Sequence, residues 1–154
     1  MVAMELGRIL EEEALSKKIQ EISFSQLVEE KDRISRIYSW CARRRDGEIC
    51  SELERVLTDA VRSLMRLRIF KAIMGLDPGK SFDSEILKMV AKIQDIVIDL
   101  FKSIPIDPYG RVPIRSKVDL EGEGLSLRRG YIYMIHLDHA MILIASGLAE
   151  PVYI

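Results

Sequence analysis

The residues best suited to bind a metal are two histidines in the last quarter of the chain. His136 and His139 are three residues apart, with Asp138 between them. At the start of a helix this spacing would place both imidazoles on one face, but a zinc site needs further ligands, and no additional Cys, His or acidic residue lies close in the sequence. We therefore favour a solvated helix cap, a role that suits Asp138 or His136. No metal ion or cofactor is predicted.

Other motifs that would indicate catalysis are incomplete. Gly122 and Gly124 resemble the start of a dinucleotide-binding motif, but no third glycine and no strand–helix unit follow them. The same objection excludes a phosphate-binding P-loop. Neither histidine has a Ser or Cys partner at a spacing typical of a nucleophile. The sequence predicts a protein that is not an enzyme.

Composition narrows the classes of protein further. The 154 residues are 48% hydrophobic and 31% charged, which is typical of a globular chain, and the net charge of −1 gives no general reason to expect nucleic-acid binding. No apolar run approaches the roughly 20 residues of a membrane span. Cys41 and Cys50 have no metal-site spacing and indicate a reducing compartment. The absence of Asn points to a thermophile.

Basic residues form two groups that need separate interpretation. One group lies in the first half of the chain: Arg33, Arg36, Arg43, Arg44, Arg45, Arg55, Arg62, Arg66, Arg68 and Lys71. These residues either contact phosphate or pair with glutamates of neighbouring helices, and we favour the pairing. The other group is Arg128 and Arg129, close to Tyr131 and Tyr133. Because Arg and Tyr are enriched at interface hot spots, these four residues are predicted to bind a partner.

The helical part of the chain is organised around Ser51–Gly75. Ser51 and Glu54 match a capping box, and Gly75 matches a helix-ending glycine. Beyond Leu64 this helix becomes apolar nearly all round, which predicts burial on several sides. Further helices are expected over residues 1–18, 23–42 and 84–103, and Ser23 with Gln26 forms a second capping box.

Two of these helices carry more apolar surface than one small bundle hides. Either the first two helices wrap them, or the surface is a subunit interface, since exposed apolar patches mark association. The second alternative predicts these interface residues: Met65, Ile69, Phe70, Ile73, Met74, Ile96, Ile98 and Phe101.

Beyond the predicted helices the sequence pattern changes from helical to β-rich. Three prolines within residues 104–116 predict a linker, because proline ends helices. Beyond it we expect a turn at Glu121–Gly124, a strand over residues 131–135 buried on both faces, a short helix over 137–146 and a strand over 149–154. The predicted fold is α+β: an antiparallel helical bundle over residues 1–103, the linker, and a small β-rich domain over 117–154.

Three stretches of the chain resemble GINS, a small complex of DNA replication. Leu10–Leu27 is similar to the family's opening, in which a Glu-rich helix leads through a basic turn to a Phe that begins the next helix. Leu64–Gly75, with its Leu and Arg residues, resembles the central helix. Leu125–Val152 resembles the small β domain, and its pattern is matched by Leu137, Ala140, Leu143, Gly147, Ala149 and Glu150.

The resemblance implies a scaffold of the archaeal type that has its helical domain first. Four subunits would associate through helical domains, as four copies of one chain or as two copies each of two chains. The assembly would bridge the MCM helicase and a RecJ-like protein, in the cytoplasm beside the nucleoid, with weak or no direct DNA binding. The alternative from the residues alone is an arginine-rich regulator that binds nucleic acid.

Overall fold

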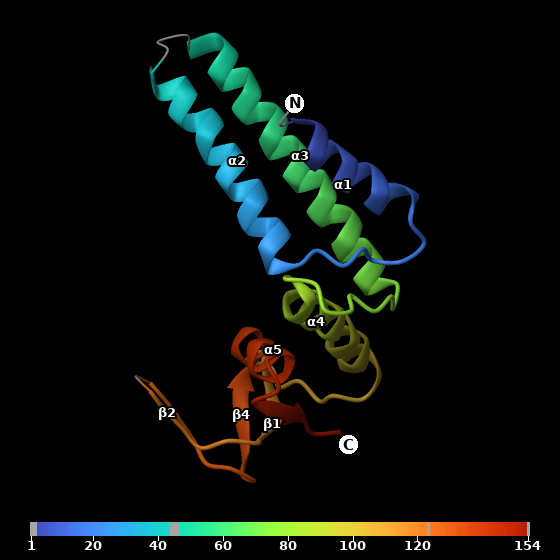
Figure 1. Cartoon of the computed structure of the whole chain (residues 1–154). Helices are drawn as coiled ribbons and strands as arrows, with labels where there is room; N and C mark the ends of the chain where they lie inside the picture. The colour runs from blue at the N-terminus through green and yellow to red at the C-terminus, as the bar shows by residue number, and fades with distance from the viewer. Residues whose placement is uncertain (1–2, 44–46, 123, 154) are drawn as a thin grey trace. The chain divides into compact units, whose positions relative to one another are not determined.

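A computed structural model describes residues 3–43, 47–122 and 124–153, and it confirms an α+β fold with the helices first. The helices are α1 (Ala3–Leu15), α2 (Phe24–Arg43), α3 (Gly47–Ile73), α4 (Ser84–Lys102) and α5 (Leu137–Ala145) (Figure 1). The strands are β1 (Arg111–Ser116), β2 (Leu120–Gly122), β3 (Leu125–Leu127), β4 (Ile132–His136) and β5 (Ala149–Pro151). None of the described helices has the length and apolar character needed to cross a membrane.

The chain divides into two compact units, Met1–Lys88 and Met89–Ile154, and the division falls inside α4. The sequence instead predicts a boundary at residue 103. The two differ because the second half of α4 belongs to the core of the second unit, where Ile96 packs with Ile104. We call residues 1–88 the helical unit and residues 89–154 the sheet unit.

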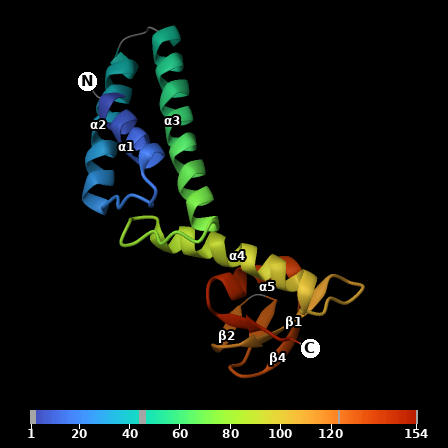
Figure 2. The same cartoon turned by 90° about the vertical axis from the view of Figure 1, so that its right-hand side faces the viewer.

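The helical unit is built on α3. Figures 1 and 2 show α2 running antiparallel beside α3, with α1 lying against α3 as well. The core is small, and its buried members come mainly from α1 and α3: Leu6, Ile22, Leu57 and Leu64. A second cluster at the far end of α3 joins Ile19, Ala72 and Leu87.

The helix ends follow local capping chemistry. The capping box before α2 is confirmed, because the Ser23 N–H donates to Gln26 Oε1 at 2.8 Å and the Gln26 N–H donates to Ser23 Oγ at 3.3 Å. The box predicted at Ser51 is wrong, since α3 begins at Gly47 and the Ser51 hydroxyl donates to the Glu48 carbonyl inside the helix. Gly75 ends α3 as predicted, with a φ of 83°.

A disulfide joins Cys41 and Cys50, whose Cα atoms are 5.7 Å apart. Cys41 lies in the last turn of α2 and Cys50 in the first turn of α3, so the bond ties two adjacent helix ends. The two cysteines are therefore not the free thiols on which the prediction of a reducing compartment depended. Their spacing gave no signal because the antiparallel packing of α2 on α3, not a sequence motif, brings them together.

The predicted linker contains the central strand of the sheet. β1 pairs antiparallel with β4 on one side and with β5 on the other. Pro113 is tolerated in β1 because its backbone polar groups face the side of β5, one residue beyond the last pair of that ladder. There its carbonyl accepts the Val152 N–H at 3.1 Å, and the one hydrogen bond that proline cannot donate falls at the end of the ladder. One of the three prolines that predicted a linker thus lies within a strand.

The sheet packs one face on a core, and its edge strand β4 leaves the other face exposed. In Figure 2, α5 lies over the core face, where Val112 and Ile114 are buried. Tyr133 and Ile135 of β4 also face this core, whereas Ile132 is 53% exposed. The prediction that this strand is buried on both faces is therefore wrong. The strands β2 and β3 on either side of the predicted turn pair antiparallel, and Glu123 of that turn lies outside the described residues.

Candidate interaction surfaces

A guanidinium group lies fully buried inside the helical unit. It belongs to Arg68 of α3, and each of its five N–H donors has an acceptor. Nε and Nη2 donate to the two carboxylate oxygens of Asp83, both at 2.7 Å. Nη1 donates to Glu13 Oε2 and to the carbonyl of Gln20, both at 2.8 Å. Nη2 also donates to Ser81 Oγ at 2.6 Å.

Lys71 extends this cluster by one turn of α3. Its ammonium group lies 2.6 Å from Glu13 Oε1, donates to the carbonyl of Lys18 at 2.9 Å, and also contacts the carbonyl of Glu13. Two cations and two carboxylates therefore neutralise one another. We call Glu13, Arg68, Lys71 and Asp83 the ionic cluster.

The ionic cluster holds four separate parts of the helical unit together. It connects the end of α1, the segment of residues 16–23, the last turns of α3 and the turn of residues 76–83. The N–H donors of Arg68 and Lys71 all bond to groups of the helical unit itself, so the cluster has a structural character rather than a catalytic one. The sequence favoured pairing of the basic residues with glutamates of neighbouring helices, and the contacts of Arg68 and Lys71 with Glu13 of α1 confirm this for both residues.

The ionic cluster predicts acid sensitivity of the helical unit. Burial alone would raise the pKa of Asp83, but hydrogen bonds from Arg68 and Ser81 and the charge of Arg68 outweigh it, so the pKa lies below its ordinary value. A lowered native pKa gives stability that is present above the unfolded pKa, about 3.9, and is lost as the pH falls through the native pKa. We expect urea midpoints to fall below about pH 4, and less steeply in Asp83→Asn. An equal slope in both proteins would contradict this.

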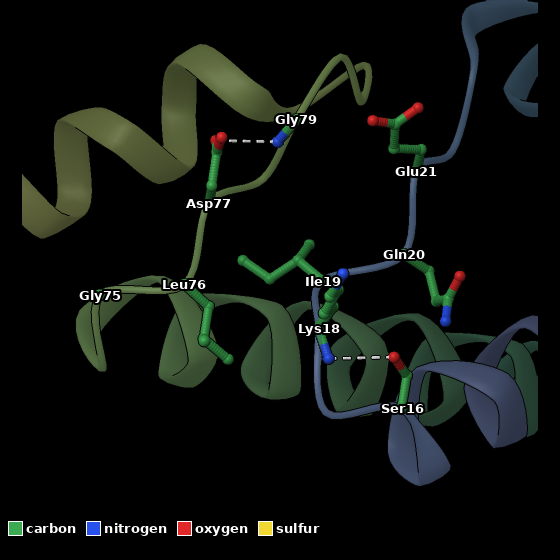
Figure 3. Close-up of a pocket in the computed structure, with 9 residues that line it drawn as sticks. All are labelled: Ser16, Lys18, Ile19, Gln20, Glu21, Gly75, Leu76, Asp77 and Gly79. Atoms are coloured by element: carbon green, nitrogen blue, oxygen red, sulfur yellow. Dashed lines mark hydrogen bonds between the residues drawn. The ribbon is translucent and has the colours of Figure 1, made fainter.

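A cleft of about 600 Å³ opens beside the ionic cluster, between residues 16–21 and 75–79. Figure 3 shows these two segments facing each other, with Ile19 pointing into the space between them. Two carboxylates, Glu21 and Asp77, line the cleft, and the Asp77 Oδ1 accepts the Gly79 N–H at 3.0 Å. Among the described residues, no three Cys, His, Asp or Glu side chains come together as metal ligands. The cleft offers polar contacts but no assembled reactive group.

A second hollow of about 300 Å³ is an apolar groove between α1, α2 and α3. Its apolar walls are formed by Leu6, Ile9, Ile22, Leu27, Ile34, Tyr38, Val61, Leu64, Met65 and Phe82. Glu30 also lines it. One carboxylate oxygen of Glu30 is 2.7 Å from Arg33, and the other, Oε2, is buried without a hydrogen-bond partner in the described part of the chain. We call this hollow the α2 groove.

The exposed arginines of α3 pair within their own helix. Arg55 Nε donates to Glu52 Oε2 at 2.9 Å, and Arg62 Nη1 donates to Asp59 Oδ1 at 2.9 Å. These are i,i+3 contacts, so Arg55 and Arg62 pair along their own helix, unlike Arg68 and Lys71, which pair with Glu13 of α1. Arg44 and Arg45, which the sequence placed in the same basic group, lie outside the described residues.

Most residues predicted for a subunit interface lie at least partly in solvent. Phe70, Met74 and Phe101 are 62%, 66% and 90% exposed, and Ile73 and Ile98 are 38% and 39% exposed. Met65 lines the α2 groove and Ile69 packs on the smaller helical core, so both are partly buried. Ile96 is different. It is 4% exposed and belongs to the core of the sheet unit, which removes it from any subunit surface.

The predicted partner-binding residues lie around one turn of the sheet unit. The Arg128 N–H donates to the hydroxyl of Tyr133 at 2.8 Å, and the Arg129 N–H donates to Asp119 Oδ1 at 2.9 Å. These bonds fix the backbone of the turn while both arginine side chains remain exposed. Tyr131 is 63% exposed beside them, whereas Tyr133 is half-buried and faces the core. The turn therefore presents two cations and one aromatic ring.

The two histidines lie at the junction of β4 and α5, and both are exposed. His136 occupies the N-cap position but makes no side-chain cap bond there. Asp138 instead accepts the His139 N–H at 2.9 Å. That hydrogen bond is the main reason that the pKa of Asp138 is lowered. Of the two residues predicted as a helix cap, His136 therefore makes no cap bond, and Asp138 binds an N–H of the first turn.

Comparisons of the chain with protein-family models, with curated proteins and with solved structures gave no match.

Proposed function

We propose that the chain is a non-catalytic scaffold subunit of a GINS-like replication complex. Its helical unit would associate with copies of itself or with a second GINS-type subunit, and the assembly would bridge an MCM helicase and a RecJ-like protein. The observation that carries the proposal is the apolar surface of the helical unit. Phe70 and Met74 are more than half exposed at the end of α3, and the α2 groove adds apolar walls along the helices.

Physical chemistry explains why such a surface favours association. Apolar area that is removed from water contributes about 25 cal/mol per Å², so covering several large side chains supplies much of the free energy of a protein interface. A partner that fills the α2 groove would also satisfy the unpaired Glu30 Oε2 if it brought an N–H donor. Leaving that oxygen unpaired costs about 1–3 kcal/mol, which adds to the driving force for a partner.

The sheet unit supplies a second contact surface in this proposal. Arg128, Arg129 and Tyr131 are exposed on a turn whose backbone is held by hydrogen bonds. A fixed turn loses little conformational entropy when a partner binds. We assign this turn to the helicase or the RecJ-like partner. The alternative, a nucleic-acid regulator, would use the same two arginines, and its DNA affinity would fall steeply with salt.

Phe70→Glu tests the association. We expect the wild-type chain to be larger than a monomer in light scattering at micromolar concentration. Because a buried unpaired charge costs several kcal/mol, we expect Phe70→Glu to weaken self-association or association with the second subunit by about 100-fold or more. Phe70 is exposed within the chain, so the variant should fold normally. Thr58→Glu, an exposed position of the same helix, is the matched control and should leave the mass unchanged.

Two results would contradict the proposal. One is a monomeric wild-type chain that also fails to bind a second GINS-type subunit, the helicase or the RecJ-like protein. The other is tight DNA binding that weakens steeply between 50 and 200 mM salt, which would favour the regulator.

A further inference from the structure

The helix α2 packs only weakly on the rest of the helical unit. Among the described residues of α2, Ile34 alone packs on the apolar core, and Glu30 is the one buried side chain. Large apolar residues of the same helix remain in solvent, including Phe24 at 68% exposed and Val28 at 53%. Most of the stability of a helix in a protein comes from tertiary packing of an apolar face, and α2 makes little such packing.

The two ends of α2 are held more firmly than its middle. Just before the helix, the Ile22 carbonyl accepts the Phe82 N–H at 2.8 Å, and the Ile22 N–H donates to Ser81 Oγ at 3.1 Å. At the other end, the disulfide joins Cys41 to Cys50 of α3. The α2 groove lies between these two attachments, with Ile34 and Tyr38 in its wall. The disulfide therefore controls how closely the second half of α2 stays against α3.

We propose that the Cys41–Cys50 disulfide is a reversible redox latch on α2. With the bond formed, α2 is held beside α3 and the α2 groove keeps its shape. With the bond reduced, the second half of α2 leaves α3 while α1 and α3, with the ionic cluster, remain folded. This inference does not rest on the proposed function, because it concerns the stability of one helix.

The chemistry is thiol–disulfide exchange with a dithiol. One thiolate of the reductant attacks one cysteine sulfur, breaks the Cys41–Cys50 bond and releases the other cysteine as a thiolate, which leaves a mixed disulfide. The second thiolate of the reductant then attacks the reductant sulfur of that mixed disulfide and releases the remaining cysteine. Two electrons and two protons pass from the dithiol to the protein, which gives two cysteine thiols and one oxidised reductant. Cys41 and Cys50 are each partly exposed, so a small dithiol reaches them without global unfolding. Accessible disulfides are the ones that exchange readily.

Hydrogen exchange on the whole chain tests the latch. We expect excess dithiothreitol to speed the exchange of amides in residues 34–43 by about tenfold or more, while residues 60–72 of α3 stay unchanged. The chain has a single tryptophan, Trp40, which is 42% exposed beside Cys41 and reports on the same region by fluorescence. Its emission should shift to longer wavelength on reduction and return on reoxidation.

The matched variant is Cys41→Ser with Cys50→Ser, which should exchange like the reduced chain and show no response to dithiothreitol. Mass spectrometry after thiol alkylation confirms the redox state of each sample. The latch is overturned if the folded chain resists the dithiol, or if the double variant behaves like the oxidised chain. It is also overturned if exchange in α2 and α3 rises together, because the bond would then stabilise the whole unit.

Discussion

Arg68→Met is expected to lower the free energy of unfolding of the helical unit by about 3–5 kcal/mol, the cost of breaking a buried ion pair from one side. The guanidinium is fully buried and donates hydrogen bonds to Glu13, Asp83, Ser81 and the Gln20 carbonyl. Methionine fills part of the same volume but donates no hydrogen bond. The carboxylate of Asp83 would remain buried without its cation. The cost of this unpaired buried charge accounts for most of the expected loss of stability.

Urea unfolding followed by the fluorescence of Trp40 measures this change, because the single tryptophan lies in the helical unit. Arg66→Met is the matched control. It lies on the same helix but is exposed, so we expect a change within about 0.5 kcal/mol. Replacing both charges, in Arg68→Met with Asp83→Leu, should recover part of the loss, since no unpaired Asp83 carboxylate remains. An Arg68→Met effect below about 1 kcal/mol would show that the cluster stays hydrated.

Local signals predicted the helices well. Periodic apolar residues located all five helices, and the reciprocal bonds of Ser23 and Gln26 confirm one capping box. The box at Ser51 failed because the same pattern also occurs inside a helix, where the serine hydroxyl bonds to a carbonyl one turn back. Capping residues therefore indicate a helix start only when the preceding residues cannot continue the helix.

The burial of the ionic cluster was not predicted from the sequence, for a different reason. Arg68 was grouped with other arginines by charge, although a signal for its burial was present in the sequence. The buried positions of α3 are Leu57, Leu64, Arg68 and Ala72, which share one helical face. A charged residue in an apolar stripe is expected to meet buried partners. The partners themselves, Glu13 and Asp83, are too distant in sequence to be predicted from local patterns.

Contacts between residues distant in the sequence also determine the structure of the second half of the chain. Prolines predicted a linker, but Pro113 lies in the central strand, where its carbonyl accepts the Val152 N–H and its missing N–H falls at the end of the ladder with β5. The even distribution of apolar residues in 131–135 predicted a strand buried on both faces. β4 is an edge strand with one open face, so Ile132 and Met134 remain exposed. Neither outcome depends on local sequence alone.

Ile96→Glu is expected to unfold the sheet unit. Ile96 is 4% exposed and lies in the core of that unit together with Ile104, Ile114 and Leu143. The variant loses about 1.5–3 kcal/mol of apolar burial and also places an unpaired carboxylate in that core, at a cost of several kcal/mol more. Small units are marginally stable, so the sum approaches the whole free energy of folding. Hydrogen exchange at the β1 amides, Val112 and Ile114, measures the loss directly.

Ile98→Glu is the control that separates this result from a failure of subunit association. It makes the same substitution on the same helix, but Ile98 is 39% exposed and lies about 200° round the helix from Ile96. We expect Ile98→Glu to keep the protection of the β1 amides, whether or not it changes the mass of the assembly. Protection in Ile96→Glu should be lost at every protein concentration, because the contact is within one chain. If protection returned at high concentration, Ile96 would belong to a subunit interface, and its assignment to the core of the sheet unit would be wrong.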